Sequence, residues 1–349
     1  YEISACLVGS EMCIRDSSTP AFLLCSYFIS MFLICKYLFY KKLQFFIWWG
    51  KMQIEAMFIK YITSQKATVR LKQTTISTYY RNFETHIKNF FEDVQTVDES
   101  IITEFTKYLL FRVSRKTAND ILTLLSSILR YNKIDIEIYK PRFTIPDIES
   151  LAYEEWERLE NYCLLHLDFL TYCILVSMYT GTRPGELCAS RVKNLNLIEC
   201  EFDITHTLQR IKNLNVGANQ KTKIIIDTPK SQKSVRSIPL INDLATIGIN
   251  LFKDISMNAF LLTGRTDKFM EVRLLETKVN EIYTKLGIEN KNVYTLRHSF
   301  ATRFYNATND IKTLSELLGH ADIKTTYRYI YTDDSRKRQG VNSLVFNRM

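Results

Sequence analysis

The chain reads Leu318-Gly319-His320-Ala321-Asp322-Ile323-Lys324-Thr325-Thr326-Tyr327-Arg328-Tyr329 near its C-terminus. A second segment, Tyr294-Thr295-Leu296-Arg297-His298, lies a short distance upstream. Arginine and histidine can hold and protonate phosphate oxygens, and a phenol can attack phosphorus to form a covalent ester. These residue types therefore point to chemistry on a phosphodiester.

A third segment, Thr180-Gly181-Thr182-Arg183-Pro184-Gly185-Glu186-Leu187, supplies another arginine. Gly181 is suited to end one helix, and Pro184 is suited to the first position of the next. Arg183 would then lie beside free backbone N–H groups at a helix N-terminus, where an anion binds readily. Glu186 could orient the guanidinium; alternatively, Arg183 only caps the turn and pairs with Glu186 structurally.

Together the three segments resemble the tyrosine recombinases, the phage-integrase family, and the resemblance covers about residues 52–331. It implies that Arg183 and Arg297 clamp a DNA phosphate and that His320 donates to a non-bridging oxygen. It also implies that Lys230 protonates the leaving 5′ oxygen. Family spacing places the attacking residue nine positions after the motif histidine, at Tyr329.

Two of these assignments have competitors. Lys233 competes with Lys230, since both lie in the turn expected between two strands, and the position directly after a Thr-Pro pair favours Lys230. Tyr327 and Tyr331 compete with Tyr329 as the nucleophile. We expect helical spacing to pack Tyr327 into the core on an apolar stripe that it shares with Ile323, Thr326 and Ile330.

One position departs from the family pattern. The family normally reads His-x-x-Arg at this point, and this chain has Tyr294 three residues before Arg297. A phenol can donate a hydrogen bond to phosphate, but its ordinary pKa of about 10 makes it a poor acid or base near neutrality. We therefore include Tyr294 among the candidate catalytic residues as a donor, and His298 as the imidazole adjacent to Arg297.

The composition fits a helical, basic protein of two domains. The chain has 349 residues and a formal net charge of +9, which favours a polyanionic partner but is weak support alone. Its 10 glycines and 6 prolines are few, as expected for a mostly helical chain. The 8 cysteines form no Cys-x-x-Cys pair, so we predict no metal and a reducing cytoplasm.

Residues 1–51 are treated apart from the fold. The uninterrupted apolar run from Ala21 to Cys35 is short for a membrane-spanning helix, so a membrane segment is the less favoured interpretation. Residues 6–16 resemble a translated sequencing adapter, and Met52 opens an ordinary domain start. We predict a non-native or disordered extension.

Residues 52–138 are predicted to form a helical core DNA-binding domain. An apolar stripe recurs at steps of three and four residues, in the order Ile76, Tyr79, Tyr80, Phe83, Ile87, Phe90 and Phe91. Two further helices are expected near Asp98–Val113 and Lys116–Tyr131, the second with Thr117 as N-cap. Arg115, Lys116, Thr117 and Asn119 are candidate DNA-phosphate contacts, although a solvated helix start explains them as well.

The rest of the chain is divided into three parts. Residues 139–150, with Pro141 and Pro146, are predicted to be a linker, and residues 151–331 a catalytic domain. Three alternating stretches suggest a small antiparallel sheet, namely Phe202–Leu208, Lys223–Asp227 and Val235–Leu240. Residues 332–349 are either a flexible tail or a segment that docks on a neighbouring protomer through residues 342–346. The fold class is mainly α with a small antiparallel β-sheet.

The resemblance implies a site-specific DNA recombinase or integrase that acts through a 3′-phosphotyrosyl intermediate without metal, ATP or another cofactor. We favour an enzyme of a mobile element; the alternatives are a Xer-type chromosome-dimer resolvase, a type IB topoisomerase, and an inactive DNA-binding relative. The implied partners are duplex DNA, three further copies in a tetramer on two DNA sites, and an accessory DNA-bending protein.

Overall fold

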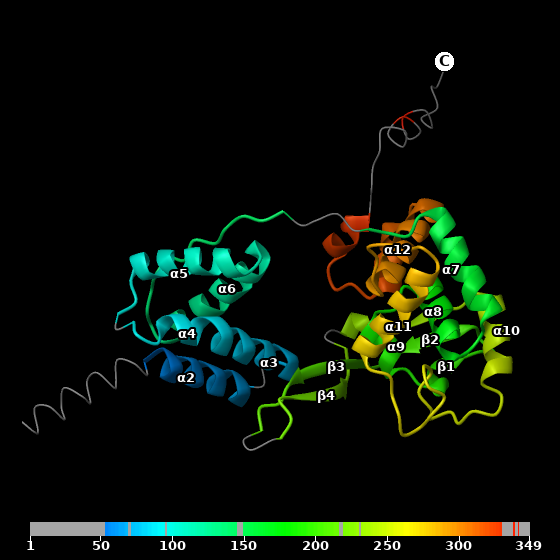
Figure 1. Ribbon diagram of the computed structural model, residues 1–349, viewed down its shortest axis with the longest axis horizontal. Coiled ribbons are helices and arrows are strands. Elements are labelled where there is room, and N and C mark those ends of the chain that lie inside the picture. The colour runs from blue at the N-terminus through cyan, green and yellow to red at the C-terminus, as the bar shows by residue number, and fades with distance from the viewer. Residues whose placement is uncertain are drawn as a thin grey trace, which may run out of the picture. The chain divides into compact units, whose positions relative to one another are not determined.

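The computed structural model describes residues 53–68, 71–94, 96–144, 149–215, 219–229 and 232–329, together with Arg338 and Val341 (Figure 1). The chain divides into two compact units, residues 1–70 with 82–141 and residues 71–81 with 142–349. Within the described part, no helix is both long enough and apolar enough to cross a bilayer. The predicted extension at residues 1–51 and the docking segment at 342–346 lie outside the described residues.

The first unit is built from helices. They are α2 Gln53–Ala67, the π-helical turn η1 Phe83–Ile87, α4 Lys88–Phe91, α5 Glu99–Arg112 and α6 Arg115–Tyr131. Phe83, Ile87 and Phe91 are buried, so this part of the predicted apolar stripe faces the core. The Phe58 and Phe83 rings stack with their centroids 3.9 Å apart, which joins α2 to this stripe.

Helix α6 begins earlier than the sequence analysis expected. Ser114, not Thr117, is its N-cap: Ser114 has extended backbone angles, and its hydroxyl accepts from the Thr117 N–H at 3.2 Å. Thr117 is the third helical residue. The predicted cap was wrong because a serine three residues upstream can satisfy the same free donors, and it leaves Arg115 and Lys116 inside the first turn.

The second unit contains the larger core. Its helices of six residues or more are α3 Gln73–Asn82 (all but its last residue), α7 Tyr153–Leu165, α8 Phe169–Thr180, α9 Pro184–Ala189, α10 Asn242–Leu251, α11 Val272–Lys285, α12 Tyr294–Thr308 and α13 Ile311–Leu318. Helix α8 is buried on nearly all sides, and it contacts α7, α10 and α12 (Figure 1). A helix that is apolar all round belongs at the centre of a domain.

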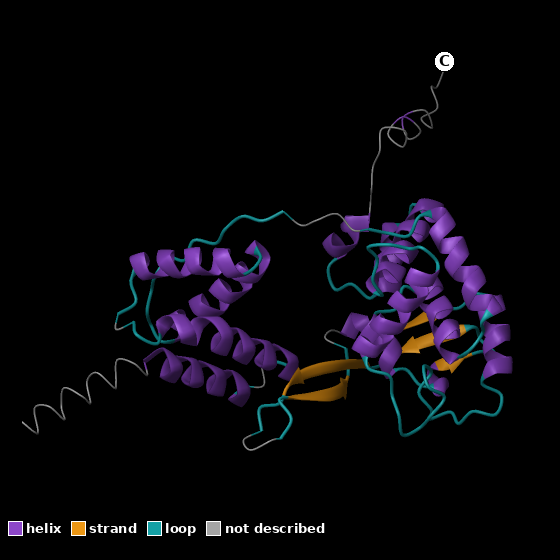
Figure 2. Ribbon diagram, in the orientation of Figure 1, coloured by secondary structure: helices purple, strands orange, loops and turns teal. Residues whose placement is uncertain are grey.

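The strands form two small sheets instead of one (Figure 2). One sheet has the order β1 Leu195–Asn196, β2 Glu201–Ile204, β5 Arg236–Pro239; the other pairs β3 Thr207–Lys212 with β4 Thr222–Asp227. All pairs are antiparallel. The predicted mainly helical fold class is confirmed, but the stretch Phe202–Leu208 breaks between β2 and β3. Alternation shows which face of a strand is buried, and it does not show which strands pair.

The split changes the surroundings of the two candidate lysines. Strands β4 and β5 do not pair with each other, so residues 228–235 connect two sheets and are not a hairpin turn. Lys230 lies outside the described residues. Lys233 lies in the short 3₁₀ turn η3 Gln232–Ser234, and it is exposed.

Gly181 is expected to be intolerant of a side chain. It has φ of 62°, and a Cβ there would lie 2.4 Å from a carbon of the Phe300 ring. We expect Gly181→Ala to lower the free energy of unfolding by roughly 2–4 kcal/mol, from left-handed backbone strain plus the clash.

Gly287→Ala is the matched control for chemical denaturation. Gly287 has φ of 64° and nothing within 4 Å of an added Cβ, so only the strain of about 1–2 kcal/mol should remain. Equal losses in the two variants would contradict the close packing of Phe300 on the end of α8.

Candidate active site

Arg183 lies at the junction of two helices. Gly181, in the left-handed conformation, ends α8, and Pro184 is the first residue of α9. The Glu186 carboxylate accepts from the Arg183 backbone N–H at 3.1 Å and from its guanidinium Nη1 at 2.7 Å. The Arg183 side chain keeps 33% of its surface exposed, so a ligand can reach the guanidinium.

Arg297 lies in the first turn of α12 and is 4% exposed. Its guanidinium donates to the Gly181 carbonyl at 2.7 Å and to the Leu318 carbonyl at 2.8 Å. Burial and the nearby charge of Arg183 lower the pKa of Arg297 to about 10, so it remains charged near neutral pH. Arg297 thus joins the end of α8 to the end of α13.

His320 follows directly after Gly319, which ends α13 in the left-handed conformation. Its Nε2 lies 2.9 Å from Nη2 of Arg297, and its Nδ1 lies 2.8 Å from the Thr326 hydroxyl. Because a guanidinium only donates, Nε2 must accept and Nδ1 must carry the proton. Burial and the charge of Arg297, with smaller contributions from other arginines, lower the pKa of His320 to about 3. The imidazole is therefore neutral at neutral pH.

Tyr329 ends the 3₁₀ helix η4 Ile323–Tyr329 and is 7% exposed. Its ring stacks on His320 with centroids 6.2 Å apart and an interplanar angle of 7°. A second imidazole, that of His298, lies 5.7 Å from the Tyr329 ring between centroids. The phenol is thus packed beside both histidines, while Tyr331 lies outside the described residues.

The expected packing of Tyr327 was wrong. Tyr327 is 55% exposed, whereas Thr326 and Tyr329 are buried. A 3₁₀ helix has three residues per turn, so positions three apart share a face, and an α-helical period does not apply here. The same face therefore carries Thr326, which binds His320, and Tyr329, which stacks on it.

Two further candidates lie at the edge of this group. Tyr294 is 43% exposed; burial and Glu276 raise its pKa, and the charges of Arg183 and Arg297 oppose this rise. Nδ1 of His298 is buried and has no hydrogen-bond partner among the described residues. Burial, with the charges of Arg297 and Arg328, lowers the pKa of His298 to about 4.

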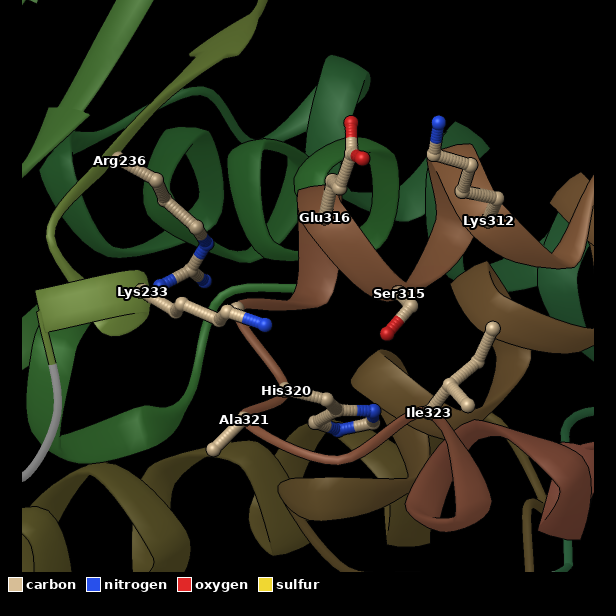
Figure 3. A pocket seen from close by; sticks show the side chains of 9 residues that line it. Lys233, Arg236, Lys312, Ser315, Glu316, His320, Ala321 and Ile323 are labelled. Atoms are coloured by element: carbon tan, nitrogen blue, oxygen red, sulfur yellow. The ribbon is translucent and has the colours of Figure 1, made fainter.

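A cavity of about 440 Å³ opens beside His320 (Figure 3). Arg236 and Lys233 reach it from the strand side, and His320 enters it from the segment after α13. Its other lining residues are Lys312, Ser315, Glu316, Gly319, Ala321 and Ile323. Arg183, Arg297 and Tyr329 are not among the lining residues, so the cavity borders the site only on the side of His320 and Arg236.

The sequence analysis missed Arg236. This residue is on strand β5, and its guanidinium donates to the same Glu186 carboxylate that holds Arg183. A signal was available: Arg236 is two positions before Ile238, which is 1% exposed, so both point to one buried face of the strand. Arginine is rarely buried unless it is paired, so an arginine at a core-facing position predicts a buried partner.

The four candidate DNA contacts lie in the first turns of α6, in the first unit. Lys116 pairs with Asp120, Thr117 shares a hydrogen bond with Ser114, and Asn119 donates to the Pro141 carbonyl at 2.9 Å. Arg115 is exposed. These partners make Asn119 a link to the segment after α6, and DNA contact by the four residues stays a prediction.

His298 should make stability depend on pH. The folded pKa of about 4 is below the ordinary value of 6.5, so at intermediate pH only the unfolded chain binds this proton. Stability from this group is therefore full above pH 6.5 and is lost as the pH falls towards 4. When the pH falls from 7 to 5, the free energy of unfolding should fall in both proteins. We expect the fall in His298→Asn to be smaller than in the unsubstituted protein by roughly 1 kcal/mol, after allowance for partial exposure. Urea denaturation at both pH values measures this.

The exposed His206 supplies the control for that comparison. His206→Asn removes one imidazole from the surface and is measured under the same conditions as His298→Asn. An unchanged pH dependence in His298→Asn would contradict the assignment of a buried, neutral His298.

The phage integrase family model matches residues 149–336, more than half of the chain, and this range includes Arg183, Arg297, His320 and Tyr329. The chain belongs to the phage integrase family. A tyrosine recombinase XerC-like protein of Caldanaerobacter subterraneus subsp. tengcongensis is 23% identical over 57% of this chain, but the match spans only 54% of that protein. The ICEBs1 integrase of Bacillus subtilis is 23% identical over 74% of this chain and 76% of its own length.

A solved structure shows the same fold. The Tn1549 transposon integrase, in complex with a circular intermediate DNA, superposes with a TM-score of 0.66 at 19% identity. The superposition covers 83% of this chain and 99% of that chain. At 19% identity this likeness shows the fold alone: the chain has the tyrosine recombinase fold.

Proposed function

We propose that the chain is a site-specific DNA recombinase that cleaves and rejoins strands through a 3′-phosphotyrosyl bond at Tyr329. The observation that carries this proposal is the contact of Tyr329 with His320, whose Nε2 accepts from Arg297 at 2.9 Å. Arg183 donates to the neighbouring Gly319 carbonyl at 3.5 Å. Three segments far apart in sequence thus place two guanidinium groups, an imidazole and a phenol together.

The charge of this group suits a phosphodiester. Among the described residues, the carboxylate of Glu186 pairs with Arg183 and Arg236, while the hydrogen bonds of Arg297 go to two carbonyls and to His320. The site therefore holds more positive than negative charge. Such preorganised donors stabilise the charge that grows on the equatorial oxygens of a pentacoordinate phosphorus, and each commonly contributes several kcal/mol.

The proposed step balances in protons and bonds. The phosphate draws Arg297 away from His320 and so frees Nε2, which takes the proton of the Tyr329 phenol. The phenol oxygen bonds to phosphorus while the bond from phosphorus to O5′ breaks. O5′ takes a proton from Lys230, and protonated His320 donates a hydrogen bond to a non-bridging oxygen. Rejoining reverses these transfers with a 5′ hydroxyl as the attacking group.

Tyr294 and His298 have secondary roles in this proposal. Tyr294, three residues before Arg297 and 43% exposed, donates from its phenol to the same phosphate. His298 borders the Tyr329 ring and stays neutral there. The phosphotyrosyl ester keeps the energy of the broken phosphodiester, so the proposed reaction needs neither ATP nor a metal ion.

The names of relatives guide the biological assignment. The ICEBs1 integrase and the Tn1549 transposon integrase favour an enzyme of a mobile element. The XerC-like relative favours the second candidate, a Xer-type chromosome-dimer resolvase. In either case we propose duplex DNA as substrate and a tetramer on two sites, with the cytoplasm as the place of action and an accessory DNA-bending protein as a further partner.

Covalent capture tests the proposal without knowledge of the target sequence. The protein is incubated with a library of nicked duplexes of random sequence, in the presence of EDTA and without ATP. We expect an adduct that survives denaturant, has its DNA blocked at the 3′ end, and leaves a 5′ hydroxyl that a kinase can label. No adduct, or an adduct to a 5′ phosphate, would refute the proposal. Sequencing of the captured DNA identifies the target site.

A further inference from the structure

Arg236 is a buried guanidinium with partners on two sides. Its side chain keeps 7% of its surface exposed. Nη2 donates to Oε2 of Glu186 at 3.0 Å, and Nη1 lies 3.3 Å from Oε1 of the same carboxylate. Nε donates to the Leu317 carbonyl at 2.6 Å, and Nη1 also donates to the Ser234 carbonyl at 3.0 Å. One planar side chain therefore joins β5, α9 and the end of α13.

Glu186 links this guanidinium to Arg183. The carboxylate accepts from Arg183 through Oε1 at 2.7 Å while it pairs with Arg236, and its side chain keeps 3% of its surface exposed. A buried carboxylate with two guanidinium partners divides its hydrogen bonds between them. Without Arg236, both oxygens of Glu186 would be free to draw the Arg183 guanidinium inward.

The last carbonyls of α13 accept hydrogen bonds from Arg236, Arg297 and Ser234. The Leu317 carbonyl accepts from Arg236, the Leu318 carbonyl from Arg297, and the Gly319 carbonyl from Ser234 at 3.3 Å. These are terminal helix carbonyls, which need partners from outside the helix, and cations are favoured at this end of the dipole. His320 is the next residue, so the bond from Arg236 to Leu317 helps to fix where the imidazole begins.

Space around Arg236 is also limited. A Cβ added to Gly319 would lie 3.0 Å from its Nη1, so the backbone before His320 passes directly against the guanidinium. Lysine has a single ammonium on a flexible stem, and it cannot reproduce the planar set of bonds to Glu186 and Leu317 together.

We infer that Arg236 is a positioning residue of the proposed strand-transfer reaction: it holds Arg183 through Glu186 and His320 through the Leu317 carbonyl, and it contacts no substrate. This inference rests on the proposed function, because Arg183 and His320 are assigned there to the scissile phosphate. Arg236 acts on catalysis through Arg183 and His320.

The test compares single-turnover cleavage of the nicked duplex recovered by covalent capture. We expect Arg236→Ala to lower the cleavage rate by about 100-fold, the scale of a misplaced catalytic group, with DNA affinity changed by less than about threefold. Arg236→Lys should lower the rate on the order of 10-fold. Arg265→Ala is the matched control, since Arg265 forms an exposed pair with Asp267, and it should cleave at the unsubstituted rate.

A neutral substrate separates positioning from general loss of structure. A methylphosphonate at the scissile position carries one negative charge less, so badly placed cations matter less there. We expect the rate deficit of Arg236→Ala to shrink to within about 10-fold on this substrate. An equal deficit on both substrates would mean that the residue only supports the fold, and it would overturn the inference.

The remaining outcomes are also decisive. Cleavage by Arg236→Lys at the unsubstituted rate overturns the inference, and if Arg236→Ala does not fold, Arg236→Lys carries the test with both substrates. Failure of the unsubstituted protein to form any adduct refutes the proposed function instead. Normal adduct formation together with an unaffected Arg236→Ala refutes only the role of Arg236.

Discussion

Replacing Tyr329 by phenylalanine is expected to abolish the covalent adduct. The variant lacks the attacking oxygen, and removal of a nucleophile commonly lowers the rate on the order of 10⁶-fold. Tyr329 is 7% exposed, and no hydrogen bond of its hydroxyl is described, so loss of that oxygen should leave folding nearly unchanged. Denaturing gels measure the adduct, and a mobility shift of the same duplex measures DNA binding, which should persist.

Tyr327→Phe is the control for that result. Tyr327 is 55% exposed and lies two residues from Tyr329 on another face of η4. We expect this variant to form the adduct at the unsubstituted rate. Loss of the adduct in Tyr327→Phe, with its retention in Tyr329→Phe, would discard the assignment of the nucleophile.

Replacing Arg297 by alanine is expected to have the second largest effect. The cleavage rate should fall about 10²–10³-fold, as when one preorganised donor to a developing oxyanion is removed. The Gly181 and Leu318 carbonyls also lose a donor, so we expect the free energy of unfolding to fall by roughly 1–3 kcal/mol. Single-turnover kinetics and chemical denaturation measure the two effects separately.

Arg303→Ala makes the comparison with Arg297→Ala specific. Arg303 is on the same helix, α12, but its guanidinium lies over the Trp156 ring, 4.5 Å from the centroid. Arg303→Ala should lower the free energy of unfolding slightly and leave the cleavage rate of the folded protein unchanged. If the two variants cleave at the same rate, Arg297 has no special relation to the scissile phosphate.

The sequence predicted the fold class and the segments that meet at the site because both depend on local signals. Gly181 ends α8 in the left-handed conformation, as the sequence predicted, and Gly319 ends α13 in the same way. Asp310 caps α13 through its side chain, and aspartate is among the residues preferred at this position. Motif spacing then named Arg297, His320 and the tyrosine that packs beside them.

The remaining features depend on choices that local patterns do not encode. Tyr327 was expected in the core because an α-helical period was assumed for a segment that adopts a 3₁₀ helix. The stretch from Phe202 to Leu208 divides between two sheets because strand pairing is decided by distant segments. Arg236 escaped notice because its partners, Glu186 and Leu317, are 50 and 81 positions away in the chain.

The most direct test of whether these side chains act on one phosphate is to identify the residue that carries the DNA in the captured adduct. Trypsin cuts after Lys324, Arg328 and Arg336, so it separates Tyr327 from Tyr329, and fragmentation distinguishes Tyr329 from Tyr331. We expect mass spectrometry to find the nucleotide on the Tyr329 oxygen. A nucleotide on Tyr327, Tyr331 or any other side chain would show that the group around Arg183, Arg297 and His320 is not where the strand is cut.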